Sequence, residues 1–582
     1  MLPCTSNKTF FSFFTFLSYI SLALCLLCNT CTTGTYSSLT SSSQCHLPLE
    51  FSSLLVASFS RDFLPASFFS VGFFSAGFAI ICRERLQKMM DERMLLDFET
   101  MMYTYRFSSC YLIGRYGMEK FKAFGITLVF FVILFQEGSV TCSSRSSRNE
   151  DGSEEWGYVQ IRPKAHLFWW FYRSPYRVDN PSEAWPIILW LQGGPGGSGV
   201  GFGNFLEIGP LDGNLKPRHF TWLRKADLLF VDNPVGTGYS YVEDSDLYVK
   251  TEEEATTDLT TLLAELLKND VNLQKSPLFI VAESYGGKFA VALALSVLKA
   301  IQQGTLKVTL GGVALGNSWI SPEDFVFSWG PLLRDLSRLD DNGLQKANSI
   351  AERIKQQLEA GQFADATNSC ADLENEISAS SNSVDFYNFL QDSDIDSNSL
   401  NAMELGLSKE VAIMRYSKYL MSKISTLGSE KDDLEKLLNG VIRKKLKIIP
   451  ENVTYEVQSW EVFESLVTDF MKPRISEVDE LLELGVNVTV YNGQVDLICA
   501  TKGTEAWLKK LKWEGLESFL EKDRTPIYCG SDKTTKGFFK SYKNLQFYWI
   551  LGAGHYVPTD EPCVALDMVG AITRSPATLN IQ

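Results

Sequence analysis

Short apolar runs bounded by turn-forming residues recur along the chain after about residue 165, and each predicts a buried strand. Segments of helical composition lie between some of these runs, at 256–267 and 288–300. Strands that alternate with helices indicate a mostly parallel sheet covered by helices on both faces, so the predicted fold class is α/β. The expected strands are 168–172, 187–191, 228–232, 279–282, 308–314, 486–491 and 547–551.

The pattern changes between about residues 330 and 469. Charged helical segments such as 344–358 and 431–447 replace the apolar runs there. We expect a helical cap at 331–469 that covers the cleft and shapes substrate choice. The α/β core would then be discontinuous, with a first part at 150–330 and a second part at 470–582.

The N-terminal part of the chain lacks the periodicity of a folded domain. Residues 1–117 are rich in Phe, Ser, Leu and Cys, and we interpret them as a non-native or disordered extension. At 118–142 two lysines precede an apolar run and small residues follow, which is the order of a secretory signal peptide, so Met118 would be the biological start. The run from Phe63 to Cys82 is long enough to span a membrane, but its serines and glycines argue against an anchor.

Composition narrows the compartment and the partners. The net charge of −15 disfavours nucleic acid and fits an acidic lumen. Asn452 and Asn487 begin N-glycosylation sequons, of which the first is expected to be the more exposed. Together with the signal peptide they indicate the secretory pathway, with a secreted or vacuolar destination. The part of the chain with a domain-like pattern has four cysteines, and sequence does not choose among their three pairings: Cys370, Cys499, Cys529 and Cys563.

Ser284 is the candidate nucleophile. It follows the apolar run 279–282, and a helical run begins at Gly286. Small residues, Ala282 and Gly286, lie two before and two after it. This is the layout of a nucleophile elbow, in which a crowded strand-to-helix turn exposes the serine hydroxyl.

A serine nucleophile needs a base, and the base needs an orienting acid. In α/β-hydrolases the acid and then the histidine follow the serine along the chain. Of the four histidines, only His555 lies after Ser284, and it ends an apolar strand in a Gly-rich turn. Asp496 stands just past the strand 486–491, where an orienting carboxylate is expected. The predicted triad is Ser284, Asp496 and His555.

A glycine-rich loop, 192–199 (Gln-Gly-Gly-Pro-Gly-Gly-Ser-Gly), follows the early strand 187–191. Such a loop lets backbone amides approach a substrate carbonyl without side chains in the way. A phosphate-binding loop is the alternative, but the Lys-Ser/Thr ending is missing and Pro195 removes a donor. The loop therefore predicts an oxyanion hole.

Three blocks of the sequence resemble the signatures of the serine carboxypeptidases, peptidase family S10. They are 189–196 (Leu-Trp-Leu-Gln-Gly-Gly-Pro-Gly), 283–287 (Glu-Ser-Tyr-Gly-Gly) and 554–558 (Gly-His-Tyr-Val-Pro). The resemblance implies an α/β-hydrolase fold, an acyl-enzyme mechanism and removal of C-terminal residues from peptides and proteins, with an acidic optimum and no metal or other cofactor. It also implies that the amides of Gly194 and Tyr285 form the oxyanion hole.

The family grips the substrate's C-terminal carboxylate with an amide side chain and two glutamates. By resemblance these are Gln192, Glu207 and Glu283. Two adjacent buried carboxyls cannot both ionise easily, so one keeps a proton and can donate it to a carboxylate. The chain departs from the family in having Gln192 where Asn is usual and Gly197 where a disulfide-forming Cys is usual, which bears on the exopeptidase preference.

Three other functions fit parts of the same pattern. An acyltransferase or an esterase would use the same triad, although many acyltransferase relatives have Asp before the nucleophile where this chain has Glu283. A non-catalytic secreted binding protein would not be expected to retain every triad member. Hydrolysis of peptides is the leading prediction.

Overall fold

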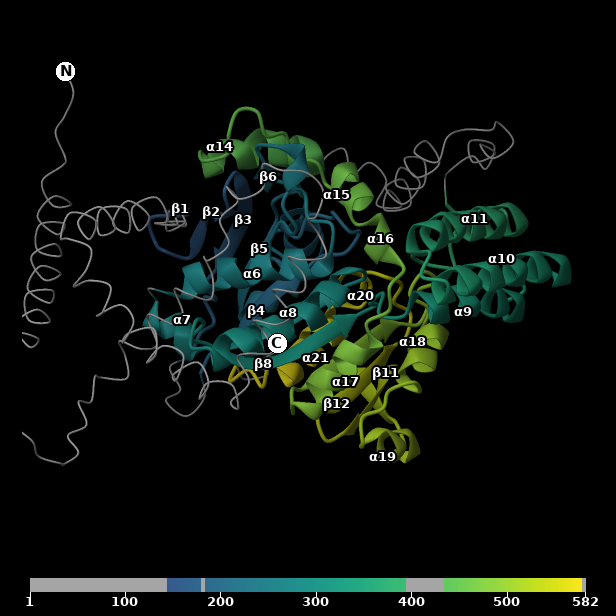
Figure 1. Ribbon diagram of the computed structural model, residues 1–582. Coiled ribbons are helices and arrows are strands. Elements are labelled where there is room, and N and C mark those ends of the chain that lie inside the picture. The colour runs from purple at the N-terminus through teal and green to yellow at the C-terminus, as the bar shows by residue number, and fades with distance from the viewer. Residues whose placement is uncertain (1–143, 179–183, 269, 394–433, 578–582) are drawn as a thin grey trace, which may run out of the picture. The chain divides into compact units, whose positions relative to one another are not determined.

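The computed structural model describes residues 144–178, 184–268, 270–393 and 434–577 (Figure 1). The extension 1–117, the signal segment 118–142 and the run from Phe63 to Cys82 lie outside the described residues. Within the described ranges, no helix combines the length and the apolar character needed to cross a membrane.

One 12-stranded mixed sheet organises the described chain. Its order is β1-β2-β3-β5-β4-β7-β8-β9-β12-β11-β10, and β6 pairs with β3. The strands from β5 to β12 in this order pair in parallel, and those outside them pair antiparallel. The strands are β1 (Ser144–Arg148), β2 (Glu154–Arg162), β3 (Ala165–Tyr172), β4 (Ile187–Leu191), β5 (Asp227–Val231), β6 (Tyr241–Val242), β7 (Pro277–Glu283), β8 (Thr309–Gly316), β9 (Val488–Gly493), β10 (Thr525–Cys529), β11 (Asp532–Tyr542) and β12 (Leu545–Ile550).

Each of the seven strands expected from sequence corresponds to an observed one, β3, β4, β5, β7, β8, β9 or β12. The α/β class is therefore confirmed. Sequence reasoning missed the short or partly exposed strands β1, β2, β6, β10 and β11. In β11, for example, only one of eleven residues is buried, because this strand lies near the edge of the sheet and needs no apolar run.

The sheet has an apolar core on each face because successive side chains of a strand point to opposite sides. In β4, Leu189 and Leu191 belong to one buried cluster, whereas Ile188 and Trp190 belong to the other. Residues of α6 and α8 pack into the first cluster and residues of α21 into the second. A parallel strand covered on both faces is apolar throughout, which explains why β4 reads as a continuous hydrophobic run.

The helices connect the strands and cover the sheet. Helix α6 begins after Thr251, whose hydroxyl caps the helix by accepting a hydrogen bond from the Glu254 N–H. The α-helices are α6 (Glu252–Leu267), α7 (Val271–Lys275), α8 (Gly286–Gln302), α9 (Pro322–Asp335), α10 (Asp341–Glu359), α11 (Phe363–Ser381), α14 (Arg443–Leu446), α15 (Trp460–Ser465), α16 (Val467–Phe470), α17 (Ile475–Glu483), α18 (Thr501–Leu508), α19 (Leu516–Glu521), α20 (Val557–Asp560) and α21 (Pro562–Ile572); wider or tighter helical turns are η2 (Val200–Ile208), η3 (Trp222–Arg224), η4 (Ser245–Leu247) and η8 (Leu438–Ile442).

The helical segment between β8 and β9 interrupts the sheet in sequence. Helices α10 and α11 lie side by side within it (Figure 1). The segment also contains an extended stretch before α15, in which Gln458 forms a bridge with Gly197 of the glycine-rich loop. It therefore contacts the part of the molecule where the chemistry is expected.

The structure shows which of the four cysteines pair and how exposed the two sequon asparagines are. Of the candidate cysteines, Cys529 and Cys563 form a disulfide that joins β10 to α21, and Cys370 and Cys499 are buried thiols. Asn452 and Asn487 are both exposed, and the Asn487 side chain also donates to the Gly311 carbonyl at 3.3 Å. The sequence had suggested a difference in exposure between the two sequons, whereas both asparagines are exposed.

Candidate active site

Ser284 occupies a sharp turn between β7 and α8. Its φ of 59° lies in the left-handed region, which is strained for a residue with a side chain. The turn is held by hydrogen bonds from the Ser284 N–H to the Gly316 carbonyl at 3.0 Å and from the Trp319 N–H to the Ser284 carbonyl at 2.9 Å. A Cβ on Gly193 would lie 2.6 Å from the Ser284 Cβ, so only glycine permits this approach. The geometry is that of a nucleophile elbow.

The order of the parallel strands brings the other candidate residues to the same edge. β7, β8, β9 and β12 are successive neighbours, so their carboxyl ends meet. Ser284 follows β7, Asn317 follows β8, Asp496 lies three residues beyond β9, and His555 lies in the loop after β12. Ligand and catalytic sites of open α/β sheets lie at this edge.

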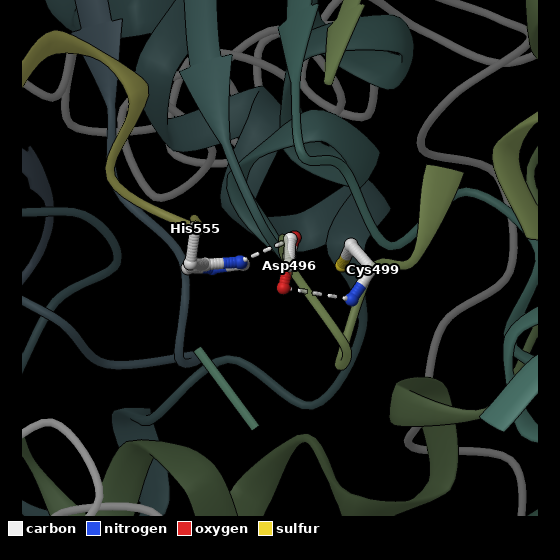
Figure 2. A group of neighbouring side chains, drawn as sticks. All are labelled: Asp496, Cys499 and His555. Carbon is white, nitrogen blue, oxygen red and sulfur yellow. Dashed lines mark hydrogen bonds and ion pairs between the residues drawn. The ribbon is translucent and has the colours of Figure 1, made fainter. Parts of the chain in front are cut away.

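Asp496 and His555 are buried and bonded to each other. The distance from His555 Nδ1 to Asp496 Oδ2 is 2.9 Å (Figure 2). A carboxylate accepts, so Nδ1 carries the proton and Nε2 is left with its lone pair. Asn317 Nδ2 also donates to Asp496 Oδ2 at 2.6 Å, and the Cys499 N–H donates to Oδ1 at 3.4 Å. These donors fix the carboxylate, which in turn fixes the imidazole.

One pocket contains most of the predicted site residues. Ser284 and His555 both face it, and Asp496 lies behind His555. Several of the lining side chains are aromatic, and one of them, Tyr387, packs edge-on against the His555 ring with centroids 4.8 Å apart. The pocket is lined by Gln192, Gly193, Gly194, Gly197, Phe202, Glu283, Ser284, Tyr285, Trp319, Tyr387, Gln458, Phe463, Phe470, Ile498, His555 and Tyr556.

Gly194 and Tyr285, which were expected to form the oxyanion hole, line the same pocket as Ser284. Gly194 has a φ of 114°, which a side chain would disfavour, and it lies in the loop that follows β4. Tyr285 follows Ser284 and precedes the first turn of α8. Both residues line the pocket, as donors to an oxyanion must.

Gln192, Glu207 and Glu283 form a buried polar cluster. Gln192 Nε2 donates to Glu283 Oε1 at 2.8 Å, and the Gln192 oxygen accepts from Trp190 Nε1 at 2.7 Å. Glu207, from η2, lies next to Glu283, and Glu207 Oε1, Glu207 Oε2 and Glu283 Oε2 are buried without a hydrogen-bond donor among the described residues. The structure therefore brings together the three residues that the resemblance implied.

Burial determines the protonation of the two glutamates. It raises the pKa of Glu207 to about 7. Burial, and then the charge of Glu207, raise the pKa of Glu283 well above its ordinary value. Two carboxyls in contact share at least one proton, because two negative charges at this distance out of water are costly. In acid the cluster is neutral and can donate hydrogen bonds.

Two groups of side chains in the described part of the chain have metal-ligand geometry. One consists of Asp496, Cys499 and His555, and the other of Cys529, Cys563 and Asp567. In the first group, Asp496 and His555 already bond each other. Burial, and then the charge of Asp496, raise the pKa of the Cys499 thiol. A metal binds the thiolate, and a raised pKa disfavours that form. In the second, the disulfide removes both thiolates. Neither group offers a complete ligand set.

A buried ionic network supports α8 beneath the pocket. Lys288 is fully buried, and its ammonium lies 2.8 Å from Glu252 Oε1. It also donates to the Asp469 and Phe470 carbonyls. Phe470 stacks on the Tyr285 ring and lines the pocket. The network therefore connects α6 and α8 with the wall of the site.

The fold and site together define an α/β-hydrolase with a serine nucleophile. A sequence profile of the serine carboxypeptidase family matches residues 146–575. Serine carboxypeptidase-like 51 of Arabidopsis thaliana is 61% identical over 459 residues, which cover 77% of this chain and 99% of that protein. The retinoid-inducible serine carboxypeptidase of Homo sapiens is 47% identical, over 73% of this chain and 92% of the relative.

Among solved structures, a prohormone-processing carboxypeptidase from Saccharomyces cerevisiae superposes with a TM-score of 0.59 at 21% identity. The superposition covers 72% of this chain and 91% of the other and shows a shared fold. The chain belongs to the serine carboxypeptidase family. The resemblance expected from the three sequence blocks is confirmed.

Among the residues of the site that sequence reasoning missed are Asn317, Tyr387 and Gln458. Asn317 had a usable signal, because it is a polar residue just past a predicted strand, at the edge where Ser284 lies. Tyr387 and Gln458 had none. Both come from the segment between β8 and β9, and only the folded chain shows that they reach the pocket.

Proposed function

We propose that this protein is a serine-type carboxypeptidase that hydrolyses single residues from the C-termini of peptides and proteins. One observation carries the proposal beyond a generic hydrolase. The buried cluster of Gln192, Glu207 and Glu283 lies beside the elbow, with Gln192 and Glu283 in the pocket wall. A neutral carboxyl and an amide can both donate hydrogen bonds to a carboxylate. In a peptide attacked at its last peptide bond, the C-terminal carboxylate lies one residue beyond the attacked carbonyl.

The chemistry follows from the contacts. Ser284 Oγ attacks the carbonyl carbon while His555 Nε2 takes its proton, and Asp496 stabilises the imidazolium through Nδ1–H. The tetrahedral oxyanion accepts hydrogen bonds from the Gly194 and Tyr285 amides. The C–N bond then breaks as His555 returns the proton to the leaving amine. Water, activated by His555, hydrolyses the acyl-enzyme and restores Ser284.

Substrate recognition uses the glutamate pair as a donor. In acid the pair is neutral, so a hydroxyl of Glu283 or Glu207 donates to the C-terminal carboxylate, assisted by the Gln192 amide. When the pair becomes negative, it repels the same carboxylate. An acidic optimum for peptides with free C-termini follows.

The remaining organisation is part of the proposal. Residues 118–142 act as a signal peptide, residues 331–469 as a cap over the cleft, and Asn452 and Asn487 as glycan sites. The Cys529–Cys563 disulfide and the two exposed asparagines support a secretory route, to the vacuole or the cell exterior. Expression from Met118 alone tests this, because an active, secreted and glycosylated product is expected; activity that requires residues 1–117 would contradict it.

Hydrolysis of matched blocked dipeptides with free and amidated C-termini tests the function. The free acids should be cleaved in acid, and Ser284→Ala should lower kcat by several orders of magnitude without unfolding the protein. Ser349→Ala, an exposed serine on α10, is the matched control and should retain full activity. Normal peptide hydrolysis by Ser284→Ala, or equal cleavage of acids and amides at every pH, would contradict the proposal.

A further inference from the structure

Gln458 presents a buried acceptor to the catalytic pocket. Its side chain is 4% exposed and lines the same pocket as Ser284 and His555. Its Nε2 donates to the Pro195 carbonyl at 2.6 Å. Its Oε1 has no hydrogen-bond partner among the described residues. Buried polar atoms are nearly always paired in native proteins, so this oxygen indicates a missing donor.

The orientation of the amide is fixed by its neighbours. The Pro195 carbonyl can only accept, so the atom that faces it must be the nitrogen, and the oxygen points elsewhere. The backbone is fixed too, because Gln458 forms a bridge with Gly197. On either side of that bridge, the Ser198 N–H donates to the Val457 carbonyl and the Ser459 N–H to the Gly196 carbonyl, each at 2.9 Å. The acceptor is therefore held rigidly against the glycine-rich loop.

The position of this oxygen restricts which donor can reach it. A Cβ built on Gly194 would lie 2.9 Å from both Gln458 amide atoms, so the acceptor is adjacent to an oxyanion donor. A peptide has two N–H groups next to the attacked carbonyl. The leaving nitrogen must face His555, which protonates it. The other N–H belongs to the residue that supplies the attacked carbonyl, and it lies on the acyl side of the oxyanion.

We infer that Gln458 is a substrate-binding residue whose Oε1 accepts a hydrogen bond from the N–H of the penultimate residue of the substrate. This inference rests on the proposed function, because it deepens the specificity of that site. It gives the substrate class a further requirement, namely a secondary amide at the penultimate residue. Peptides with proline or an N-methylated residue there cannot make the bond, and simple acyl esters lack the donor.

The test uses two blocked dipeptides that differ only in penultimate alanine or N-methylalanine. We expect wild type to favour the N–H substrate in kcat/KM by about tenfold to one hundredfold, the range for leaving a buried acceptor unpaired. Gln458→Met keeps the shape but not the acceptor, so kcat/KM for the N–H substrate should fall by a similar factor. The N-methyl substrate should change little, and the ratio between the two substrates should approach one.

Two further variants separate binding from loop support. Ser459→Ala is the control for loop support. The Ser459 hydroxyl accepts a hydrogen bond from the Val462 N–H at the start of α15, and Ser459 does not line the pocket. This variant should leave the substrate ratio unchanged. Gln458→Glu, assayed in acid as the neutral carboxyl, retains a donor for Pro195 and an acceptor for the substrate, so the preference for N–H should be largely rescued.

The outcomes are distinct. If Gln458→Met slows both substrates equally, the side chain only supports the loop and the inference is wrong. If wild type cleaves both substrates equally well, the inference is also wrong, whether or not any variant folds. If wild type cleaves neither substrate, the proposed function itself fails and the inference with it.

Discussion

Replacing Glu207 with Gln tests the glutamate pair most directly. Burial raises the pKa of Glu207 to about 7, so the pair of glutamates is expected to lose its first proton near neutral pH. Glu283 is the member of the pair that lines the pocket, and a negative charge on the pair about 4 Å from a substrate carboxylate costs about 4 kcal/mol at an effective dielectric of about 20. The ionised form therefore binds the substrate about a thousandfold more weakly. For wild type, kcat/KM for a free-acid peptide should fall about tenfold for each pH unit above about 7.

The assay is kcat/KM against pH for a blocked dipeptide and its amide, with wild type and Glu207→Gln. The amide lacks the carboxylate, so its profile should not show the decline that ionisation of the glutamate pair causes for the acid. In Glu207→Gln the titrating neighbour is absent, and the decline for the acid above about pH 7 should become much shallower. Parallel acid and amide curves in both proteins would refute the reasoning and favour a plain esterase or acyltransferase.

The same group links stability to pH. A folded-state pKa raised from 4.5 to about 7 means that the folded protein holds the proton more tightly than the unfolded chain. Its contribution to stability is therefore fully present below about pH 4.5 and is lost as pH rises through about 7. The loss is about 3 kcal/mol of unfolding free energy. Urea denaturation at pH 4.5 and 7.5 should show this loss in wild type and a smaller one in Glu207→Gln.

Two other substitutions separate catalysis from stability. Asn317→Ala should lower kcat by about tenfold to one hundredfold, because Asp496 loses the side-chain donor that lies 2.6 Å away. Steady-state kinetics measures this effect, and circular dichroism checks that the variant is folded. An unchanged kcat would show that Asn317 does not orient Asp496. Lys288→Met should lower the unfolding free energy by about 1.5–3 kcal/mol, because Glu252 loses a fully buried partner while it keeps its ion pair with Arg474. Lys472→Met, which removes a partly exposed lysine, should cost under about 1 kcal/mol in the same urea titration, and equal losses for the two lysines would contradict the argument.

The sequence predicted the parts of the fold that are buried on both faces. β4 and β7 read as apolar runs because parallel strands in the centre of the sheet have no polar side. The candidate triad residues could be found for a related reason, since each follows such a run. β11 could not be found this way, because its polar residues suit a partly exposed strand near the edge.

Residues that reach the site only through tertiary contacts could not be predicted from the local sequence pattern. Gln458 is 263 residues from Pro195, and nothing near Gln458 in the sequence indicates that the two meet. The sequence shows that the glycine-rich loop has Gly197 where the family usually has a disulfide-forming cysteine. It does not show that Gly197 instead pairs with Gln458. Local pattern therefore predicts strand ends, and long-range pairing determines which other residues reach them.

The position of β8 in the sheet has a consequence for synthesis of the chain. β8 pairs with β7, which is made earlier, and with β9, which is made later. Between Gly316 and Val488 the ribosome must add roughly 170 residues, which takes about 10–30 s at typical rates. During that time β8 has an open edge without its second partner, and an open apolar edge is prone to pair with other chains. Production of this enzyme should therefore depend on chaperones that bind the nascent half-sheet, even though the finished protein conceals that edge completely.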